Sequence, residues 1–257
     1  MYDEIDNLLG DERGRYCFDC ASLVERALTV IDRLETEQLR PRPPERKEHE
    51  LALEWLASVC GGPAAVAALH DRPLTDDGLG LPLVESAADR QRLDAVAELL
   101  DGAAERFFDA EVGHALRRAL LRLWELEPLV VLGARPATQV AAGICHAVAS
   151  ANGLVGPKGV VRQSALRQFF TVSQSPSAYA PPVTQTLRGF WPWHDVSRPW
   201  MWQRQLPELT ALGYADLLTA RVRGQLLRVR DQAVAAAGAG QAGTRKPSPT
   251  SSCAIGT

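Results

Sequence analysis

The strongest helical pattern in the chain runs from about Asp109 to Leu126. Apolar side chains recur there at intervals of three and four residues, so that they share one face of an α-helix while the arginines fall elsewhere. The apolar positions are Val112, Ala115, Leu116, Ala119, Leu120, Leu123 and Trp124. Because Pro128 cannot continue a helix, the pattern predicts an amphipathic helix that ends just before it.

A second pattern, made of small residues, follows between Gly133 and Ala151. Gly133 suits the end of the preceding helix, and Pro136 suits a first helical turn, where its missing N–H removes no hydrogen bond. Alanine and glycine then fill most sides of the helix, so that neighbouring helices are able to approach it closely. The apolar positions at helical spacing are Val140, Ile144, Ala147, Val148 and Ala151. We therefore expect this helix at the centre of the fold.

The segment after this helix predicts a turn and a shorter helix. Asn152-Gly153 and Gly156-Pro157 break the helical pattern, and Val160 to Phe170 then predicts a short helix. Its apolar positions are Val161, Leu166, Phe169 and Phe170. A buried helix, a turn and a compact helical segment in this order are typical of a cyclin-like or helix-turn-helix module.

The remaining periodic segments also favour helices, and evidence for strands is poor. The other expected helices are Cys20 to Leu39, Glu48 to Cys60, Pro63 to His70, Ala88 to Ala104 and Ala211 to Ala235. The segment from Asp71 to Ser86 has no period and predicts a loop. The β-branched cluster from Leu129 to Leu132 is short, and we interpret it as a connection between helices. The predicted fold class is all-α, a helical bundle with a cyclin-like or helix-turn-helix-like module.

Four of the six tryptophans lie in the segment WPWHDVSRPWMWQRQLP, which follows Phe190. The prolines within this segment exclude a regular helix. We expect an irregular strap that packs across the helical body, because burial stabilises large aromatic rings. The alternative is an exposed aromatic surface that stacks on bases, with Arg198 and Arg204 near phosphates.

The small-residue helix and its turn resemble two known families. One is an uncharacterised bacterial domain of unknown function with a helix-turn-helix-like end, matched here at Ala141, Ala142, Gly143, Ile144, Asn152 and Leu154. More distantly, the chain from about Val112 to Phe190 resembles the second half of the cyclin-like repeat of general transcription factor B. The resemblance implies a helical module with a role in DNA-associated regulation.

This chain departs from both families where a recognition helix is expected. The sequence there is SQSPSAYAPPVTQTLRGF, and Pro181-Pro182 inside a helix would remove hydrogen bonds and clash with the preceding turn. The recognition helix is therefore expected either as a single turn from Ser177 to Ala180 or, displaced, from Val183 to Phe190.

Charge is distributed unevenly along the chain, although the formal net charge is only −3. The first 157 residues carry 16 basic and 27 acidic residues, whereas the segment from Lys158 to Arg230 carries ten basic and three acidic ones. A basic half favours binding to nucleic acid or another polyanion, since phosphate attraction grows with the number of cations. The alternative is that these cations are solvated or attract the acidic half. The last helix carries four arginines beside its apolar stripe, and two interpretations are open. They either clamp a polyanion, or their apolar stems cover the edges of a helix docked on the protein; the residues are Arg221, Arg223, Arg228 and Arg230.

Common catalytic and cofactor-binding motifs are missing from the sequence. There is no phosphate-binding loop, no dinucleotide-binding glycine motif, no nucleophile elbow and no H-E-x-x-H zinc motif. Cys17 and Cys20 have the spacing of half a zinc site, without a second pair to complete it. His114 and His146 are interpreted as core histidines, and the adjacent His194-Asp195 as a pair that does not act together. We expect no enzyme activity, no catalytic residue, no cofactor and no metal site.

The compartment and the domain organisation follow from composition. The five cysteines are scattered and odd in number, which favours reduced thiols. No apolar run is long enough to span a bilayer, and the acidic start MYDEIDNLLGDE differs from a secretory signal. We expect a cytoplasmic protein without a membrane partner. The predicted regions are an acidic helical region at 1–104, the helical module with the tryptophan-rich strap at 105–235, and a disordered tail at 236–257.

The predicted function is that of a non-catalytic DNA-associated regulatory protein. The residues expected to neutralise phosphates are Lys158, Arg162, Arg167 and Arg188. The residues expected to lie near base edges are Gln163, Ser175, Ser177 and Gln185. The alternative is a helical protein–protein interaction module without nucleic-acid binding, with the tryptophan-rich segment and the acidic first half as its surfaces.

Overall fold

The computed structural model describes residues 24–31, 46–76, 78, 80–156, 159–188 and 211–242. Contacts divide the chain into two compact units, Met1–Arg46 and Lys47–Thr257, and each is described by itself. In the first unit, residues 24–31 form an α-helix, within the segment predicted from Cys20 to Leu39. The tryptophan-rich segment lies outside the described residues.

Every regular element in the described part of the chain is a helix, which confirms the predicted all-α class. A single parallel bridge between Val155 and Val161 is the β-type pairing found among these residues. The elements of the second unit are α3 (Glu48–Cys60), α4 (Pro63–Ala67), α5 (Ala87–Phe107), α6 (Ala110–Leu126), α7 (Pro128–Leu132), α8 (Ala137–Ala151), α9 (Gln163–Phe169), the 3₁₀ turn η1 (Pro176–Ala178), α10 (Ala180–Arg188), the 3₁₀ turn η4 (Ala215–Leu217) and α11 (Ala220–Ala242).

Residues at the helix ends explain where several of these helices begin and stop. Ser86 and Asp109 cap α5 and α6, because each side chain accepts a hydrogen bond, of 3.3 and 3.0 Å, from the backbone N–H three residues later. Gly61 ends α3 in the left-handed conformation, with φ of 98°. A Cβ at Gly61 would also lie 2.4 Å from the carbonyl oxygen of Gly213. Glycine is therefore required at this helix end for two reasons.

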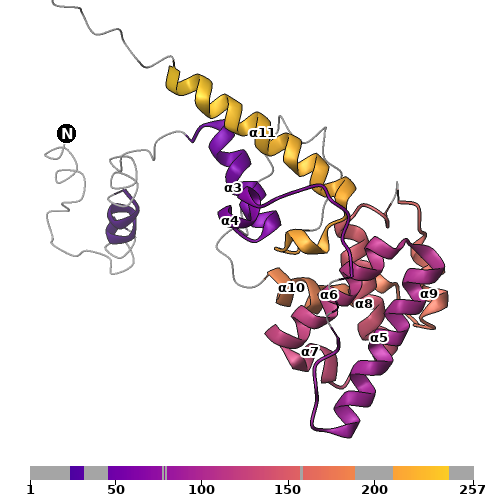
Figure 1. Ribbon diagram of the computed structural model, residues 1–257. Coiled ribbons are helices and arrows are strands. Elements are labelled where there is room, and N and C mark those ends of the chain that lie inside the picture. Colours follow the sequence, from indigo (N-terminus) through magenta and orange to yellow (C-terminus); the bar gives the residue numbers. More distant parts are fainter. Residues whose placement is uncertain are drawn as a thin grey trace, which may run out of the picture. The chain divides into compact units, whose positions relative to one another are not determined.

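α8 lies at the centre of the second unit, as its small-residue pattern predicts. It packs against α5, α6, α7, η1 and α10 (Figure 1). Every residue from Val140 to Ala149 is buried, and so is Ala151. A helix enclosed on all sides leaves little space for long side chains, which explains its alanines. The predicted central position is confirmed.

α11 packs along α3, which lies far from it in the sequence (Figure 1). The predicted apolar stripe is buried and consists of Leu218, Val222, Leu226 and Val229. The helix begins at Ala220, later than the predicted Ala211, because the 3₁₀ turn η4 precedes it. It continues to Ala242, so that residues 236–242 of the segment predicted to be disordered are helical. Alanine dominates this stretch and has the highest helix propensity of all residues.

The structure divides the chain after Arg46, not at the predicted boundary between residues 104 and 105. α5 continues through the predicted boundary and packs against α6 and α8, which follow it. α3, also assigned to the predicted N-terminal region, packs against α11. These contacts place α3 and α5 in the same unit as the helices after residue 105.

Two local expectations differ from the structure. The segment from Leu129 to Leu132 belongs to the short helix α7, which Pro128 opens and the buried Val131 anchors. Pro181 and Pro182 lie in the first turn of α10, where backbone N–H groups have no partner within the helix and the rings remove no hydrogen bond. The structure thus combines the two alternatives for this region: η1 comes first and α10 follows.

Candidate nucleic-acid interface

The predicted interface is built from α9, a turn, η1 and α10. Leu166 and Phe170 are buried at the inner side of α9, and Val172 is buried in the turn. Val183 and Leu187 are buried at the inner side of α10. Because η1 and α10 both pack against α8, the central helix supports this whole region.

A close backbone contact fixes the end of η1 on α8. A Cβ at Gly143 would lie 2.4 Å from the carbonyl oxygen of Tyr179, so only glycine permits this approach. The hydroxyl of Tyr179 accepts a hydrogen bond of 3.3 Å from the Gln174 N–H. The turn after α9 is therefore tied to the same tyrosine that rests on α8.

The turn itself contains a strained residue. Thr171 adopts the left-handed backbone conformation, with φ of 54°. A β-branched residue is rarely found there, because its Cβ crowds the neighbouring backbone. The N–H groups of Thr171 and Val172 bond to the carbonyl oxygens of Gln168 and Arg167, each at 3.2 Å, and so close the end of α9.

The structure brings together three of the residues predicted to lie near base edges. The Ser175 hydroxyl donates to Oε1 of Gln163 at 2.6 Å, and the Ser177 hydroxyl donates to Oγ of Ser175 at 3.0 Å. These half-buried side chains link the start of α9 to η1. Gln185 is exposed on α10, and within the described residues no hydrogen bond joins it to the other three.

The cations predicted to bind phosphates occupy both short helices. Arg162 is the N-cap residue of α9 and Arg167 lies in its last turn, and both are exposed. Arg188 is half-buried in the last turn of α10. Among the described residues, none of the three forms an ion pair with a carboxylate. The fourth predicted cation, Lys158, lies outside the described residues.

The sequence segment that forms this region lacks acidic residues. Comparing the net charge of the two halves of the chain does not reveal this feature. No Asp or Glu occurs between Glu127 and Asp195. The basic residues of this tract are Arg135, Lys158, Arg162, Arg167 and Arg188. A tract without carboxylates presents positive charge that is not compensated locally, even in a chain that is acidic overall.

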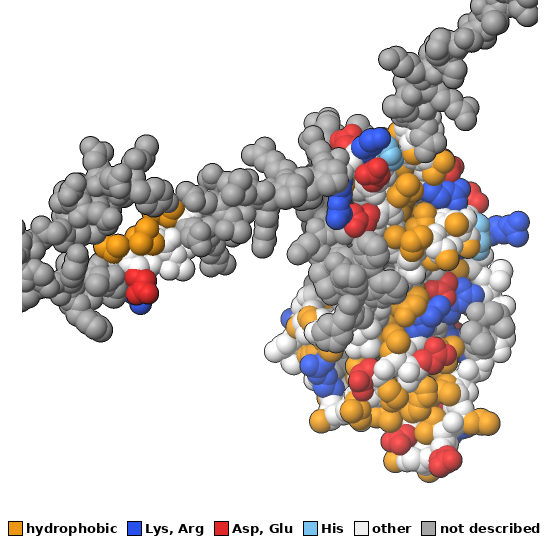
Figure 2. Space-filling view, turned by 90° about the vertical axis from the view of Figure 1, so that its left-hand side faces the viewer, with side chains coloured by type: hydrophobic (Ala, Val, Ile, Leu, Met, Phe, Trp, Pro, Cys, Tyr) orange, Lys and Arg blue, Asp and Glu red, His pale blue; other side chains and the backbone are white. Residues whose placement is uncertain are grey.

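Charges of both signs also lie close together on the folded molecule. Figure 2 shows one face of the molecule, on which blue and red side chains are interspersed among hydrophobic ones. In addition, α3 from the acidic half of the sequence packs against α11 from the basic half. Folding therefore balances part of the uneven charge that the sequence shows.

The arginines of α11 bond mostly to the protein itself. Nη2 of Arg221 donates to the carbonyl oxygen of Asn152 at 2.7 Å, and Nη1 of Arg230 donates to that of Val66 at 3.3 Å. Arg223 is only 3% exposed. These contacts support the interpretation of α11 as a docked helix, in preference to a polyanion clamp.

The buried titratable groups have the properties of core side chains. Burial raises the pKa of Cys60 and of Cys145 to about 12, so that neither thiol is a nucleophile near neutral pH. Burial also lowers the pKa of His146 below its ordinary value of 6.5. Nδ1 of His146 lies 3.1 Å from the hydroxyl of Ser150, which gives the ring a polar partner inside the core.

The described part of the chain has no cluster of metal ligands and no membrane-spanning helix. No group of three or more His, Cys, Asp and Glu side chains in this part of the chain is arranged to hold a metal ion. Cys17, Cys20 and the His194-Asp195 pair lie outside it. No described helix combines the length and the apolar character needed to cross a lipid bilayer.

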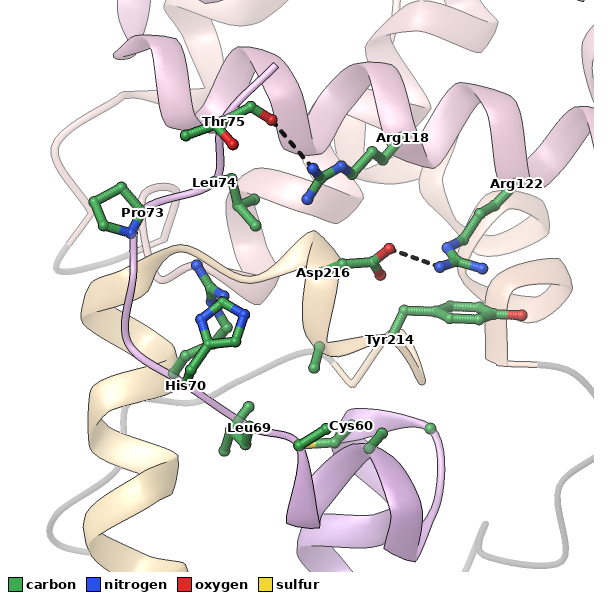
Figure 3. Close-up of a pocket in the computed structure, with 15 residues that line it drawn as sticks. Cys60, Leu69, His70, Pro73, Leu74, Thr75, Arg118, Arg122, Tyr214 and Asp216 are labelled. Atoms are coloured by element: carbon green, nitrogen blue, oxygen red, sulfur yellow. Dashed lines mark hydrogen bonds and ion pairs between the residues drawn. The ribbon is translucent and has the colours of Figure 1, made fainter. Parts of the chain in front are cut away.

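The structure contains a cavity that the sequence pattern does not indicate. It has a volume of about 440 Å³ and lies between the end of α3, the loop after α4, α6 and the segment before α11 (Figure 3). Its lining includes Arg118, Arg122 and Arg223. In the sequence these arginines occupy the polar positions of two separate helices, and only the fold brings them to one place.

No known protein family, curated protein or solved structure matches the chain. Because one helical architecture serves many activities, the fold class does not decide the function either. The function is therefore inferred from the geometry and chemistry of the protein's own residues.

Proposed function

We propose that this protein is a non-catalytic, DNA-associated regulator that binds duplex DNA through α9, the turn after it and α10. The observation that carries the proposal is a sequence tract without carboxylates that forms two short helices, which pack, through η1 and α10, on the buried helix α8. In a helix-turn-helix module the second helix enters the major groove, while the first crosses the DNA backbone. α10 takes the place of the second helix here, and α9 takes the place of the first.

The exposed side chains suit these two roles. Arg162 and Arg167 on α9 and Arg188 on α10 would neutralise phosphates, and Lys158, from the same basic tract of the sequence, would add a fourth cation. Gln185 is exposed on α10 and carries the donor and acceptor pair that reads adenine in the major groove. The hydrogen-bonded series of Gln163, Ser175 and Ser177 supplies an ordered polar edge near the bases.

The strained turn also supports the proposal. Backbone strain persists only where the surrounding structure enforces it, and it is concentrated at functional sites. Thr171 occupies the turn between the two helical parts, where helix-turn-helix modules often have glycine. A fixed turn would hold α9 and η1 in one orientation for contact with DNA.

A mobility-shift titration of duplex DNA over a salt series tests this function. In the triple variant Arg162→Ala/Arg167→Ala/Arg188→Ala, we expect the affinity to fall by about tenfold or more and the salt slope to decrease by about 1 for each arginine lost. The matched control, Arg90→Ala/Arg106→Ala/Arg228→Ala, removes the same charge from exposed positions on other helices and is expected to keep the parental slope. The assignment is wrong if the first triple variant binds duplex with unchanged affinity and slope.

The alternative function is a protein–protein interaction module without nucleic-acid binding. The observation in its favour is a pair of exposed leucines where α6 meets α7, since Leu126 and Leu129 are 49% and 70% exposed. A partner retained after nuclease treatment and in about 0.5 M salt, which screens phosphate contacts, would favour this alternative. A protein that shows no salt-dependent binding to duplex DNA would favour it as well.

A further inference from the structure

A second cavity, of about 510 Å³, lies along one face of α6. Trp124 of α6, Gly80 and Pro82 of the loop before α5, and Asp216 of η4 form part of its lining. The other lining residues, spaced by three and four positions and so on one face of α6, are Arg118, Leu121, Arg122 and Glu125. The volume of this cavity is in the range typical of small-molecule sites.

The charges in this lining are balanced by the protein itself. The lining contains two arginines and two carboxylates, so the formal charges cancel. Nη2 of Arg122 donates to Oδ2 of Asp216 at 2.6 Å, and Nη2 of Arg118 donates to the carbonyl oxygen of Thr75 at 3.1 Å (Figure 3). Glu125 is exposed, so that water screens its charge. A charged ligand would lose hydration and compete with these contacts, and the lining therefore favours a neutral ligand.

The Arg122–Asp216 ion pair is held in place and is still accessible. The guanidinium carbon of Arg122 lies 4.0 Å from the centre of the Tyr214 ring, which supports it from one side. The side chains of Arg122 and Asp216 are 32% and 37% exposed, so both can touch a ligand. A guanidinium has five N–H donors and a carboxylate has several acceptor positions, and the bond between them uses only some of these. The pair therefore offers a donor and an acceptor side by side, which is the pattern that an amide group matches.

The apolar part of the lining consists of Trp124, Leu121 and Pro82. All three side chains are half-buried, so each keeps part of its apolar surface outside the core. Trp124 packs against the hydrophobic core and is therefore held in position. An indole ring attracts other aromatic rings in offset or edge-to-face arrangements, beyond the gain from burying apolar area. This part of the lining favours a ligand with a flat, apolar body.

We infer that this cavity binds a neutral, planar aromatic molecule with an amide group, its ring against Trp124 and its amide on the Arg122–Asp216 pair. Small-molecule sites typically combine an apolar wall with a few polar groups that fix the orientation of the ligand, and this cavity has both. Because the ion pair is already positioned, the ligand loses little conformational entropy of the protein on binding. The site uses none of the residues of the proposed DNA-binding surface and does not depend on that function.

Isothermal titration calorimetry on the full chain tests the inference with three probes that share one ring system. The probes are 2-naphthamide, which is neutral, 2-naphthoate, which is an anion, and 2-naphthylmethylamine, which is a cation at neutral pH. We expect saturable binding of one equivalent of 2-naphthamide. Its dissociation constant is expected to be lower than that of either charged probe by about tenfold, because a charged group would lose water without gaining an unpaired partner.

One pair of variants tests the aromatic wall. Trp124→Leu keeps an apolar side chain and removes the flat ring, so it is expected to weaken binding of 2-naphthamide several-fold. The matched control is Phe108→Leu, which makes the same kind of change at a half-buried aromatic residue outside the cavity lining. This control is expected to leave the affinity for 2-naphthamide unchanged.

A second pair of variants tests the ion pair. Asp216→Asn removes one negative charge from the lining and frees Arg122, so 2-naphthoate is expected to bind about tenfold more tightly than it does to the parent. The matched control is Asp101→Asn, which removes the carboxylate that pairs at 2.7 Å with another arginine of α6, Arg117, outside the cavity lining. A gain in affinity cannot result from misfolding, which keeps the test valid if Trp124→Leu proves unstable.

Three results would overturn the inference. The first is that 2-naphthamide does not bind in a saturable manner, or binds no more tightly than both charged probes. The second is that Trp124→Leu and Phe108→Leu affect its binding equally, and the third is that Asp216→Asn does not strengthen the binding of 2-naphthoate. The triple variant of Arg162, Arg167 and Arg188 is expected to bind 2-naphthamide as the parent does, so that a failure here and a failure of the DNA-binding proposal are told apart.

Discussion

α8 and the first half of α11 are both held by buried residues, but by different forces. α8 is enclosed on every side by apolar contacts between small residues. α11 buries one apolar stripe against α3, and next to that stripe it buries the charged Arg223. The comparison teaches that an apolar helix can be buried when its side-chain volumes fit those of its neighbours. A buried charge, by contrast, needs specific partners from other parts of the chain.

Glu111 on α6 is the main partner of this polar region. Its Oε1 accepts hydrogen bonds from the backbone N–H of Leu74 at 2.9 Å and from that of Ala220 at 2.7 Å, and it pairs with Arg223 at 3.3 Å. One carboxylate thus fixes the loop after α4, the start of α11 and the buried arginine. Acidic groups near a helix start are also favoured by the helix dipole.

Asn152 joins the end of α8 to the segment that begins α11. Its Nδ2 donates to the carbonyl oxygen of Leu217, and its Oδ1 accepts from the N–H of Thr219 at 2.6 Å. Because Asn152 follows the last residue of α8, the end of the apolar helix is bonded directly to the start of the polar-anchored one. The side chain is fully buried and its amide makes bonds in both directions, as buried polar groups require.

The largest expected effect is at Glu111. In Glu111→Ala, the buried guanidinium of Arg223 loses its carboxylate and two backbone N–H groups lose their acceptor, so we expect the free energy of unfolding to fall by about 4 kcal/mol. Urea denaturation followed by circular dichroism measures this change. Glu125→Ala, at an exposed position on the same helix, is the matched control and is expected to have almost no effect. Equal stability of the two variants would show that α11 does not depend on this polar anchor.

The second prediction contrasts one glycine of α8 with one glycine of α11. A Cβ at Gly143 in α8 would lie 2.4 Å from a backbone oxygen, so Gly143→Ala is expected to destabilise the protein by about 2 kcal/mol. A Cβ at Gly224 in α11 would meet the Asp71 Cβ at an ordinary 3.7 Å, so Gly224→Ala is expected to stabilise it by up to about 1 kcal/mol through helix propensity. Thermal unfolding measures both changes. The contrast fails if the two substitutions shift the melting temperature in the same direction.

The smallest expected effect concerns pH and His146. Burial lowers the pKa of this histidine in the folded protein, so the unfolded chain binds the proton more readily. Its contribution to stability is complete above the ordinary pKa of about 6.5 and declines as the pH falls below that value. We expect stability to fall less steeply between pH 7.5 and pH 5 in His146→Gln than in the parent, as measured by urea unfolding at several pH values. Identical slopes would contradict the assignment of His146 to the apolar core.

Much of the helical layout is predictable from the sequence, because local signals mark it. The apolar period of α6, the predicted range Glu48 to Cys60 of α3 and the alanine-rich pattern of α8 all appear in the structure as expected. The start of α11 was less predictable, since the 3₁₀ turn before it depends on contacts that Asn152 and Glu111 provide. Pro181 and Pro182 were misleading for a related reason: their effect depends on where the helix begins, and packing of η1 and α10 on α8 decides that.

The candidate sites show the same limit to what can be predicted from the sequence. The basic residues of α9 and α10 could be proposed from the sequence, because they lie in one continuous tract. The cavity of about 440 Å³ could not, because the arginines that line it come from α6 and α11, about a hundred positions apart. Nothing in either helix alone distinguishes Arg223, which is buried, from Arg228, which is exposed on the same helix.

The sequence by itself determined that this chain is helical, where most of its helices lie and which of them is enclosed by its neighbours. These features depend on local periodicity and side-chain volume, and both can be read along a single helix. Only the tertiary structure decided which charges are buried, which carboxylate neutralises them and where three arginines meet around a cavity. Those outcomes depend on electrostatic contacts over a few ångströms between segments that the chain keeps far apart.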